Sequence, residues 1–166
     1  MSLVVEDGTG LSNAESYISE AESLTYQASR GNTTWNTITS GRREEALRRA
    51  TDYMLQAYRA SWQGVRGSST QALDWPRYDV VVDGYYLASN VIPQAVKNAC
   101  AELALRAAAG ELYSDQSQGV VSKQVGSIKV EYDKSSPTSV RYKSIDSLLL
   151  PYLKGLGGVN VRMIIQ

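Results

Sequence analysis

Histidine and phenylalanine are both absent from this chain of 166 residues, and cysteine occurs once, as Cys100. Histidine is the commonest general base and metal ligand, and it activates many serine and cysteine nucleophiles. A single cysteine excludes an internal disulfide and fits a reducing compartment. We therefore expect no catalytic residue, no metal ligand set and no cofactor. Cys100 is expected in the core.

An excess of charge of either sign is also missing, because 17 basic and 17 acidic side chains give a formal net charge of zero. Proteins that bind DNA alone are usually basic, since phosphate neutralisation dominates their affinity. No apolar run is long enough to span a bilayer, and the first residues do not resemble a signal peptide. We expect no membrane partner. Tyrosine is abundant, with 11 residues, and suits protein interfaces.

Apolar residues at helical spacing predict a mainly α fold, a small bundle of about four helices. The first helix is expected at about 13–30, after a capping box formed by Ser12 and Glu15. A polar connection follows, in which Trp35 is a candidate for burial. The second helix is expected at about 42–61.

The third and fourth helices carry clear boundary signals. The third has Pro93 in its first turn and stops at Gly110, and its many alanines place it at the centre of the bundle. The fourth is expected at about 144–154. It should kink or end early near Leu150, because Pro151 lies inside it.

A long connection of mixed composition runs from residue 62 to residue 93. Unstructured loops longer than about 12–15 residues are uncommon in compact domains unless they have a role. Pro76 fixes its own φ angle and favours an extended Trp75, whose ring can fill the edge of the core. We expect Trp75, Pro76 and Arg77 to anchor the connection against the body.

The chain after the third helix changes its period. Alternating apolar and charged residues from Ile128 to Tyr132 predict a β-hairpin at about 119–133. Residues 1–154 then form the helical domain, and residues 155–166 form a glycine-rich joint and an extended C-terminal tail. An apolar chain end needs a host, and strand addition to a partner would provide one. The predicted docking residues of the tail are Val159, Val161, Arg162, Met163, Ile164 and Ile165.

Charged residues of the second helix and the hairpin have two interpretations. They form a solvated surface, or they make contacts between subunits. The candidate contact residues are Arg42, Arg43, Glu45, Arg49, Lys129 and Glu131.

Two further patterns suggest binding sites but fit structural roles better. Gly8-Thr9-Gly10 lacks the lysine of a P-loop and the third glycine of a dinucleotide fingerprint, so it reads as a turn. Trp35, Trp62 and Trp75 could stack single-stranded bases, but tryptophan is more often largely buried.

Five segments occur in an order that resembles a known family: "VEDGTGLSNAESYIS", "REEALRRATDYM", "QALDWPR", "IPQAVKNACAELALRA" and "GSIKVEYD". Together they resemble the head–tail adaptor (connector) proteins of tailed bacteriophages, a family often labelled "putative DnaT-like single-stranded DNA-binding protein". The resemblance extends from Val4 to about Tyr152.

The resemblance implies a connector-like, mostly helical subunit of a ring, commonly of twelve copies, beneath the portal of a phage head. Such a ring extends the DNA channel and joins the head to a neck, tail-completion or terminator protein. Double-stranded DNA passes through its lumen without sequence-specific binding. The implied location is the head–tail junction of the virion, after synthesis in the bacterial cytoplasm.

The alternative function is that of a single-stranded DNA-binding accessory protein. It would use the arginines of the second helix, with Trp62 and Trp75 as stacking platforms.

Overall fold

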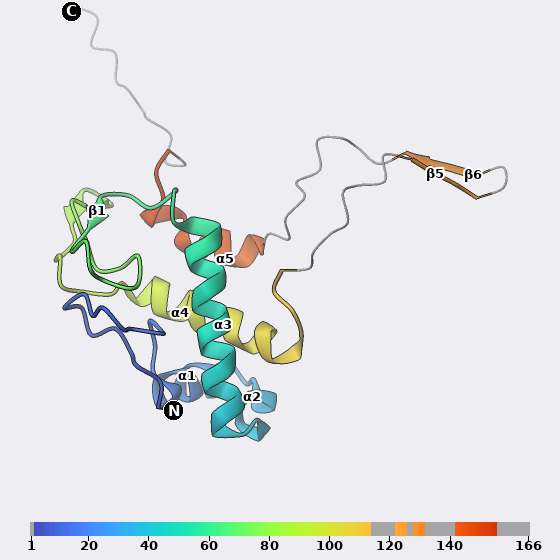
Figure 1. The fold of residues 1–166 in the computed structure, drawn as a ribbon, viewed down its shortest axis with the longest axis horizontal. Coiled ribbons are helices and arrows are strands. Elements are labelled where there is room, and N and C mark those ends of the chain that lie inside the picture. The colour runs from blue at the N-terminus through green and yellow to red at the C-terminus, as the bar shows by residue number, and fades with distance from the viewer. Residues whose placement is uncertain (1, 114–121, 126–127, 132–141, 156–166) are drawn as a thin grey trace, which may run out of the picture.

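The computed structural model describes residues 2–113, 122–125, 128–131 and 142–155. Within them the chain is α-rich, with short antiparallel strand pairs between and beside the helices (Figure 1). The helices are α1 (Glu20–Ala28), α2 (Thr33–Thr37), α3 (Ser40–Tyr58), α4 (Gln94–Ala109), α5 (Lys143–Leu149) and the 3₁₀ turn η1 (Leu150–Tyr152). None of the helices in these ranges is both long and apolar enough to cross a membrane.

The core of the molecule lies where α4 packs against α3, and α4 also contacts α1 and α5. One face of α4 is fully buried and consists largely of small residues, so that the backbones approach closely. Its buried residues are Val96, Ala99, Cys100, Ala101, Leu103, Ala104 and Ala107. The predicted central position of this alanine-rich helix is confirmed.

The first helix starts later than predicted. The sequence contains the Ser-x-x-Glu spacing twice, and the structure uses the second copy: Ser19 caps α1 and Glu22 completes the capping box. The expected box of Ser12 and Glu15 is wrong. Glu15 instead accepts a hydrogen bond from the Val4 amide and pairs with the Arg48 guanidinium at 3.0 Å. These bonds hold the segment before α1 against the start of the chain.

The other helices follow the prediction more closely. In the connection before α3 the predicted burial of Trp35 is confirmed, but the short helix α2 that carries it was not predicted. Pro151 ends the regular part of the last helix, since α5 stops at Leu149 and passes into η1.

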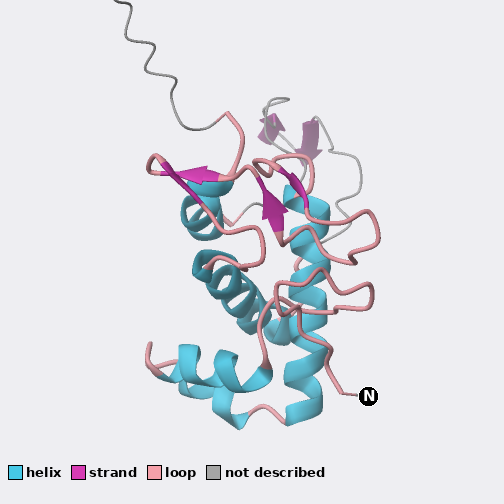
Figure 2. Ribbon diagram, turned by 90° about the vertical axis from the view of Figure 1, so that its left-hand side faces the viewer, coloured by secondary structure: helices cyan, strands magenta, loops and turns pink. Residues whose placement is uncertain are grey.

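Short strands occupy the long connection between α3 and α4, where none was predicted. Two-residue strands are too short to show alternation in the sequence. The pairs are β1 (Val65–Arg66) with β2 (Arg77–Tyr78) and β3 (Val81–Val82) with β4 (Tyr85–Tyr86). Both lie at the end of the body opposite α1 and α2 (Figure 2).

The hairpin predicted at about 119–133 corresponds to β5 (Ser122–Val125) and β6 (Ile128–Glu131), which pair antiparallel. Its Val125 stands opposite Ile128 in the register. The C-terminal tail from residue 156 onward lies outside the described residues.

Candidate protein-interaction surface

The guanidinium of Arg77 joins two parts of the long connection, the stretch shortly after α3 and the stretch that leads into β2. Its Nε donates to the Gln63 carbonyl at 2.6 Å, and its two Nη atoms donate to the carbonyls of Asp74 and Gly64 at 3.0 and 2.8 Å. Arg77 is only 6% exposed. Because charged donors make the stronger hydrogen bonds, one side chain holds three backbone segments together. We call this arrangement the Arg77 clasp.

Trp75 and Pro76, the other two predicted anchor residues, are buried beside the clasp. The peptide bond between them is cis. The Trp75 ring packs edge-to-face on Trp62, with centroids 5.6 Å apart, and on Tyr152, at 5.9 Å. The structure therefore places the whole anchor trio where the connection meets α3 and η1.

The alternative that uses tryptophans as base-stacking platforms is wrong in its mechanism. Trp35, Trp62 and Trp75 each have no exposed surface. A base can stack only on a ring whose face it can reach. These three rings are parts of the core.

The most exposed aromatic residues of the connection are tyrosines on the β3–β4 hairpin. Its turn residues, Asp83 and Gly84, have φ angles of 52° and 86°, the left-handed values that a two-residue hairpin turn requires. Tyr85 and Tyr86 follow the turn and are 77% and 78% exposed.

The hairpin is fixed at its base although its tip projects. Val80, just before β3, is fully buried, and its carbonyl accepts a hydrogen bond from the Leu87 amide at 2.9 Å. The Val81 amide donates to the Gln63 side chain, whose amide group donates in turn to the Pro151 carbonyl at 2.7 Å. The two exposed tyrosines are therefore carried by a hairpin whose base is hydrogen-bonded to the body of the protein.

Further exposed apolar side chains lie in the hairpin itself and in the separate β1–β2 pair that precedes it in the chain. Val65 pairs across β1–β2 with Tyr78, and Val81 pairs across β3–β4 with Tyr86. We define the hairpin surface as Val65, Tyr78, Val81, Tyr85 and Tyr86, all of them exposed. Exposed apolar clusters rich in tyrosine are typical of sites that bind other proteins.

Two carboxylates give the hairpin surface an acidic character. Asp79 and Asp83 follow β2 and β3 directly, and both side chains are exposed. Among the described residues neither takes part in an ion pair. The surface therefore attracts cationic groups and repels phosphates.

The sequence contains a signal for this hairpin, although the hairpin was not among the predicted elements. In the segment Val81-Val82-Asp83-Gly84-Tyr85-Tyr86, an Asp-Gly pair stands between β-branched and aromatic residues. That pattern is a strong short-range hairpin signal. Which tyrosines are exposed could not be read from it, because burial depends on the body beneath the hairpin.

Asp74 is a buried carboxylate next to the clasp. Its side chain is 1% exposed, and its nearest cationic atom is Arg59 Nε at 3.7 Å. Neither carboxylate oxygen accepts a hydrogen bond from another described residue. Burial raises the pKa of Asp74, while the charges of Arg59 and Arg77, the nearby Trp62 indole N–H and the charge of Arg66 oppose the rise.

Asp74→Asn should raise the free energy of unfolding at pH 7 by about 1–2 kcal/mol, because it removes a poorly solvated charge. The folded-state pKa lies above the ordinary value of 3.8, so the folded protein binds the proton more readily. The wild type should therefore gain stability as the pH falls from the folded pKa toward 3.8, and the gap to Asp74→Asn should close. Urea unfolding across this pH range measures both effects. A less stable Asp74→Asn at neutral pH would contradict the prediction.

The predicted subunit-contact residues of α3 divide into two groups. Arg43 pairs with Glu20 at 2.7 Å, and Arg49 pairs with Glu111 at 2.8 Å and donates to the Ala107 carbonyl. These two arginines therefore join elements within the chain. Arg42 and Glu45 are exposed and line a shallow hollow beside the end of α4.

The remaining predicted contact and docking residues lie wholly or partly outside the described residues. Lys129 and Glu131 belong to β6, but their side chains lie outside what the structure describes. The tail residues Val159, Val161, Arg162, Met163, Ile164 and Ile165 lie outside the described residues altogether.

The glycine loop near the start of the chain binds a carboxylate of its own. The buried Glu6 side chain accepts hydrogen bonds from the amides of Gly8, Gly10 and Leu11 at 2.8–3.0 Å. These donors are the ones that a phosphate would use. The loop is a turn, as its sequence indicated, and the Glu6 carboxylate, which was not predicted, occupies its amide donors.

Cys100 faces the centre of the fold, where it has no exposed surface. Its sulfur lies 3.4 Å from Thr51 Oγ1 and 3.8 Å from Ser16 Oγ. Burial raises the pKa of the Cys100 thiol, and contacts with the Thr51 and Ser16 hydroxyls act in the opposite sense. No group of three or more acidic, cysteine or histidine side chains in the described ranges could hold a metal ion.

Cys100 should resist thiol reagents in the folded protein. A buried thiol with a raised pKa supplies little reactive thiolate, so labelling should be at least about a hundredfold slower than in the urea-unfolded chain. Thr37→Cys, at an exposed position of α2, is the matched control and should react quickly under native conditions. Rapid native labelling of the wild type would contradict this burial.

The described residues form a small α-helical domain, with short strand pairs packed at one end of its helices. The family model described as "Putative DnaT-like ssDNA binding protein" matches residues 1–165, so the chain belongs to this family. The family label that accompanied the sequence resemblance is thereby confirmed, and the head–tail adaptor role stays a prediction. Comparison with curated proteins gave no match, and neither did comparison with solved structures.

Proposed function

We propose that this chain is a structural subunit of a tailed-phage virion, a head–tail adaptor that forms a ring beneath the portal. The ring, of about twelve copies as the family resemblance implies, extends the DNA channel and joins the head to a neck, tail-completion or terminator protein. Double-stranded DNA passes through it without sequence-specific contacts, and no membrane takes part. The subunit is made in the host cytoplasm and functions at the head–tail junction.

The observation that supports an assembly role most strongly is the hairpin surface. Tyr85 and Tyr86 are each more than three-quarters exposed, although the base of their hairpin is fastened to the core. Exposed aromatic groups on a rigid support bind a partner with little loss of conformational entropy. A protein that works as a joint in an assembly requires such a surface.

The test is the native mass of this chain co-expressed with the portal protein encoded near it. A portal ring that carries a full complement of the chain is the expected result, and its mass gives the number of copies. Deletion of residues 157–166 should abolish docking and leave the monomer folded, if the tail is the anchor. A chain that never associates with the portal would contradict the adaptor role.

Single-stranded DNA binding is the second candidate function, and the description of the family favours it. Since the tryptophans are buried, bases would stack on exposed tyrosines, of which the described residues include Tyr78, Tyr85 and Tyr86. The neighbouring carboxylates of Asp79 and Asp83 oppose a polyanion at this surface. Titration of labelled single-stranded DNA at low and moderate salt tests this function, because electrostatic binding to DNA weakens steeply as the salt concentration rises.

A further inference from the structure

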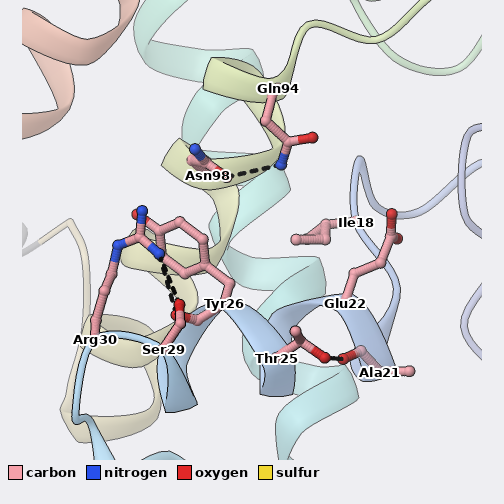
Figure 3. Close-up of a pocket in the computed structure, with 9 residues that line it drawn as sticks. All are labelled: Ile18, Ala21, Glu22, Thr25, Tyr26, Ser29, Arg30, Gln94 and Asn98. Atoms are coloured by element: carbon pink, nitrogen blue, oxygen red, sulfur yellow. Dashed lines mark hydrogen bonds between the residues drawn. The ribbon is translucent and has the colours of Figure 1, made fainter.

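An open groove of about 580 Å³ lies between α1 and the first turns of α4 (Figure 3). Tyr26 and Arg30 form one side of it, and Gln94 and Asn98 form the other. Cavities of about 300–1,000 Å³ bury whole small molecules, so this groove can accept more than one aromatic ring.

The polar groups of the groove are held in place before anything binds. Gln94 Nε2 donates to Asn98 Oδ1 at 2.9 Å. The Arg30 guanidinium lies over the Tyr26 ring, 3.5 Å from its centroid, and donates to the Tyr26 carbonyl and the Ser29 hydroxyl. The groove therefore offers amide groups and a fixed cation along an aromatic side.

The charge of Arg30 is not balanced by a carboxylate in the described part of the chain. No ion pair there includes it, whereas Glu22, the acidic residue of the groove, pairs with Lys97 at 2.9 Å. A fitting ligand thus carries a carboxylate and an aromatic or hydroxyl group.

Groups of this chemistry stand on the β3–β4 hairpin of the same chain. Tyr86 and Val81 pair across the strands and share one exposed face, and their side chains lie close together on it. Asp83 stands at the turn with no ion-pair partner among the described residues. The hairpin tip therefore supplies an aromatic ring, a hydroxyl and a carboxylate together.

We propose that the β3–β4 hairpin of one copy docks in the α1–α4 groove of the next copy, with Tyr86 in the groove and Asp83 beside Arg30. This contact rests on the proposed ring function and specifies how neighbouring subunits meet. It gives Arg30 and Asp83, neither of which has an ion-pair partner among the described residues, a partner in the neighbouring copy. Tyrosine and arginine are also the residues that most often dominate interface energies.

The contact is between copies because one chain cannot make it alone. The short strands lie at the end of the body opposite α1 (Figures 1 and 2). Two different patches that recognise each other form a heterologous interface, which generates a closed ring or an open filament. Each copy then contributes one hairpin and one groove.

Disulfide trapping tests the contact directly. Val81→Cys places a thiol across the strand pair from Tyr86 on the same exposed face. Thr25→Cys places one in the groove, and the buried Cys100 does not compete. Mixed under mild oxidation, alone and with co-expressed portal protein, these two variants should form a covalent dimer and nothing larger. A chain that carries both cysteine substitutions should form a series of covalent oligomers of increasing size, because it can be linked to a neighbour on each side. Thr37→Cys, an exposed threonine outside the groove, replaces Thr25→Cys as the matched control and should trap at least about tenfold less.

Three substitutions in these cysteine variants identify the groups involved. Tyr86→Ala should reduce trapping by about 30-fold, the effect of losing an interface hot spot. Asp83→Asn, which suits the turn, and Arg30→Gln should each reduce it by about two- to fivefold. The two together should cost no more than one alone, because they remove the same ion pair.

The outcomes separate the contact from the adaptor role. Trapping no greater than with Thr37→Cys, or additive effects of Asp83→Asn and Arg30→Gln, would overturn the contact. If the wild type still loads onto the portal in that case, the adaptor role stands. If specific trapping occurs but the portal is never bound, the contact stands and the adaptor role fails.

Discussion

Arg77→Ala should lower the free energy of unfolding by about 3–5 kcal/mol, as removal of a buried charged partner generally does. The substitution removes three hydrogen bonds and leaves the carbonyls of Gln63, Gly64 and Asp74 without their donor. It also deprives the buried Asp74 carboxylate of a nearby positive charge. Urea unfolding followed by circular dichroism measures the loss.

The matched control is Arg59→Ala. Arg59 also faces Asp74, but its side chain is 55% exposed and the contact is 3.7 Å long. Exposed ion pairs contribute at most about 1 kcal/mol. Arg77→Lys should remain well below the wild type, because one ammonium group cannot reproduce the planar fork that meets three carbonyls. Equal losses for Arg59→Ala and Arg77→Ala would show that the clasp does not hold the connection.

Gly64→Ala should lower the free energy of unfolding by about 2–5 kcal/mol. Gly64 has a φ angle of 62°, and an added Cβ would overlap the carbonyl oxygen of Tyr78. A left-handed conformation costs an L-residue about 1–2 kcal/mol, and overpacking adds about 1–3 kcal/mol. Thermal and urea unfolding of the variant measure the sum.

Gly84→Ala separates these two contributions. Gly84 has a φ angle of 86°, but no atom lies within 4 Å of an added Cβ. Only the conformational cost of about 1–2 kcal/mol should remain there. If the two alanine variants were equally stable, the close approach of β2 to Gly64 would add nothing to the cost of the Gly64→Ala substitution.

The sequence predicted elements whose signals are local and extend over several turns. α4 has an unbroken apolar stripe between Pro93 and Gly110, so its position and its place in the core followed directly. The start of α1 could not be chosen between two identical spacings. Its true position depends on Glu15 meeting Arg48, a partner 33 residues away.

The sequence shows the residues that make up the hairpin surface but not that they are exposed together. Abundant tyrosine and an Asp-Gly turn are visible in the sequence, but the exposure of Tyr85 and Tyr86 depends on what lies beneath the hairpin. The arginines of α3 show the same limit. Arg43 and Arg49 reach Glu20 and the end of α4, and these pairings arise from helix packing that no local pattern reports.

The burial of all three tryptophans has a spectroscopic consequence. Indole emission from this chain reports only on its interior, since Trp35, Trp62 and Trp75 have no contact with solvent. Docking at Tyr86 would leave the wavelength of that emission unchanged, whereas unfolding would shift it to the red. The emission spectrum of a variant that no longer docks therefore shows whether that variant has kept its fold.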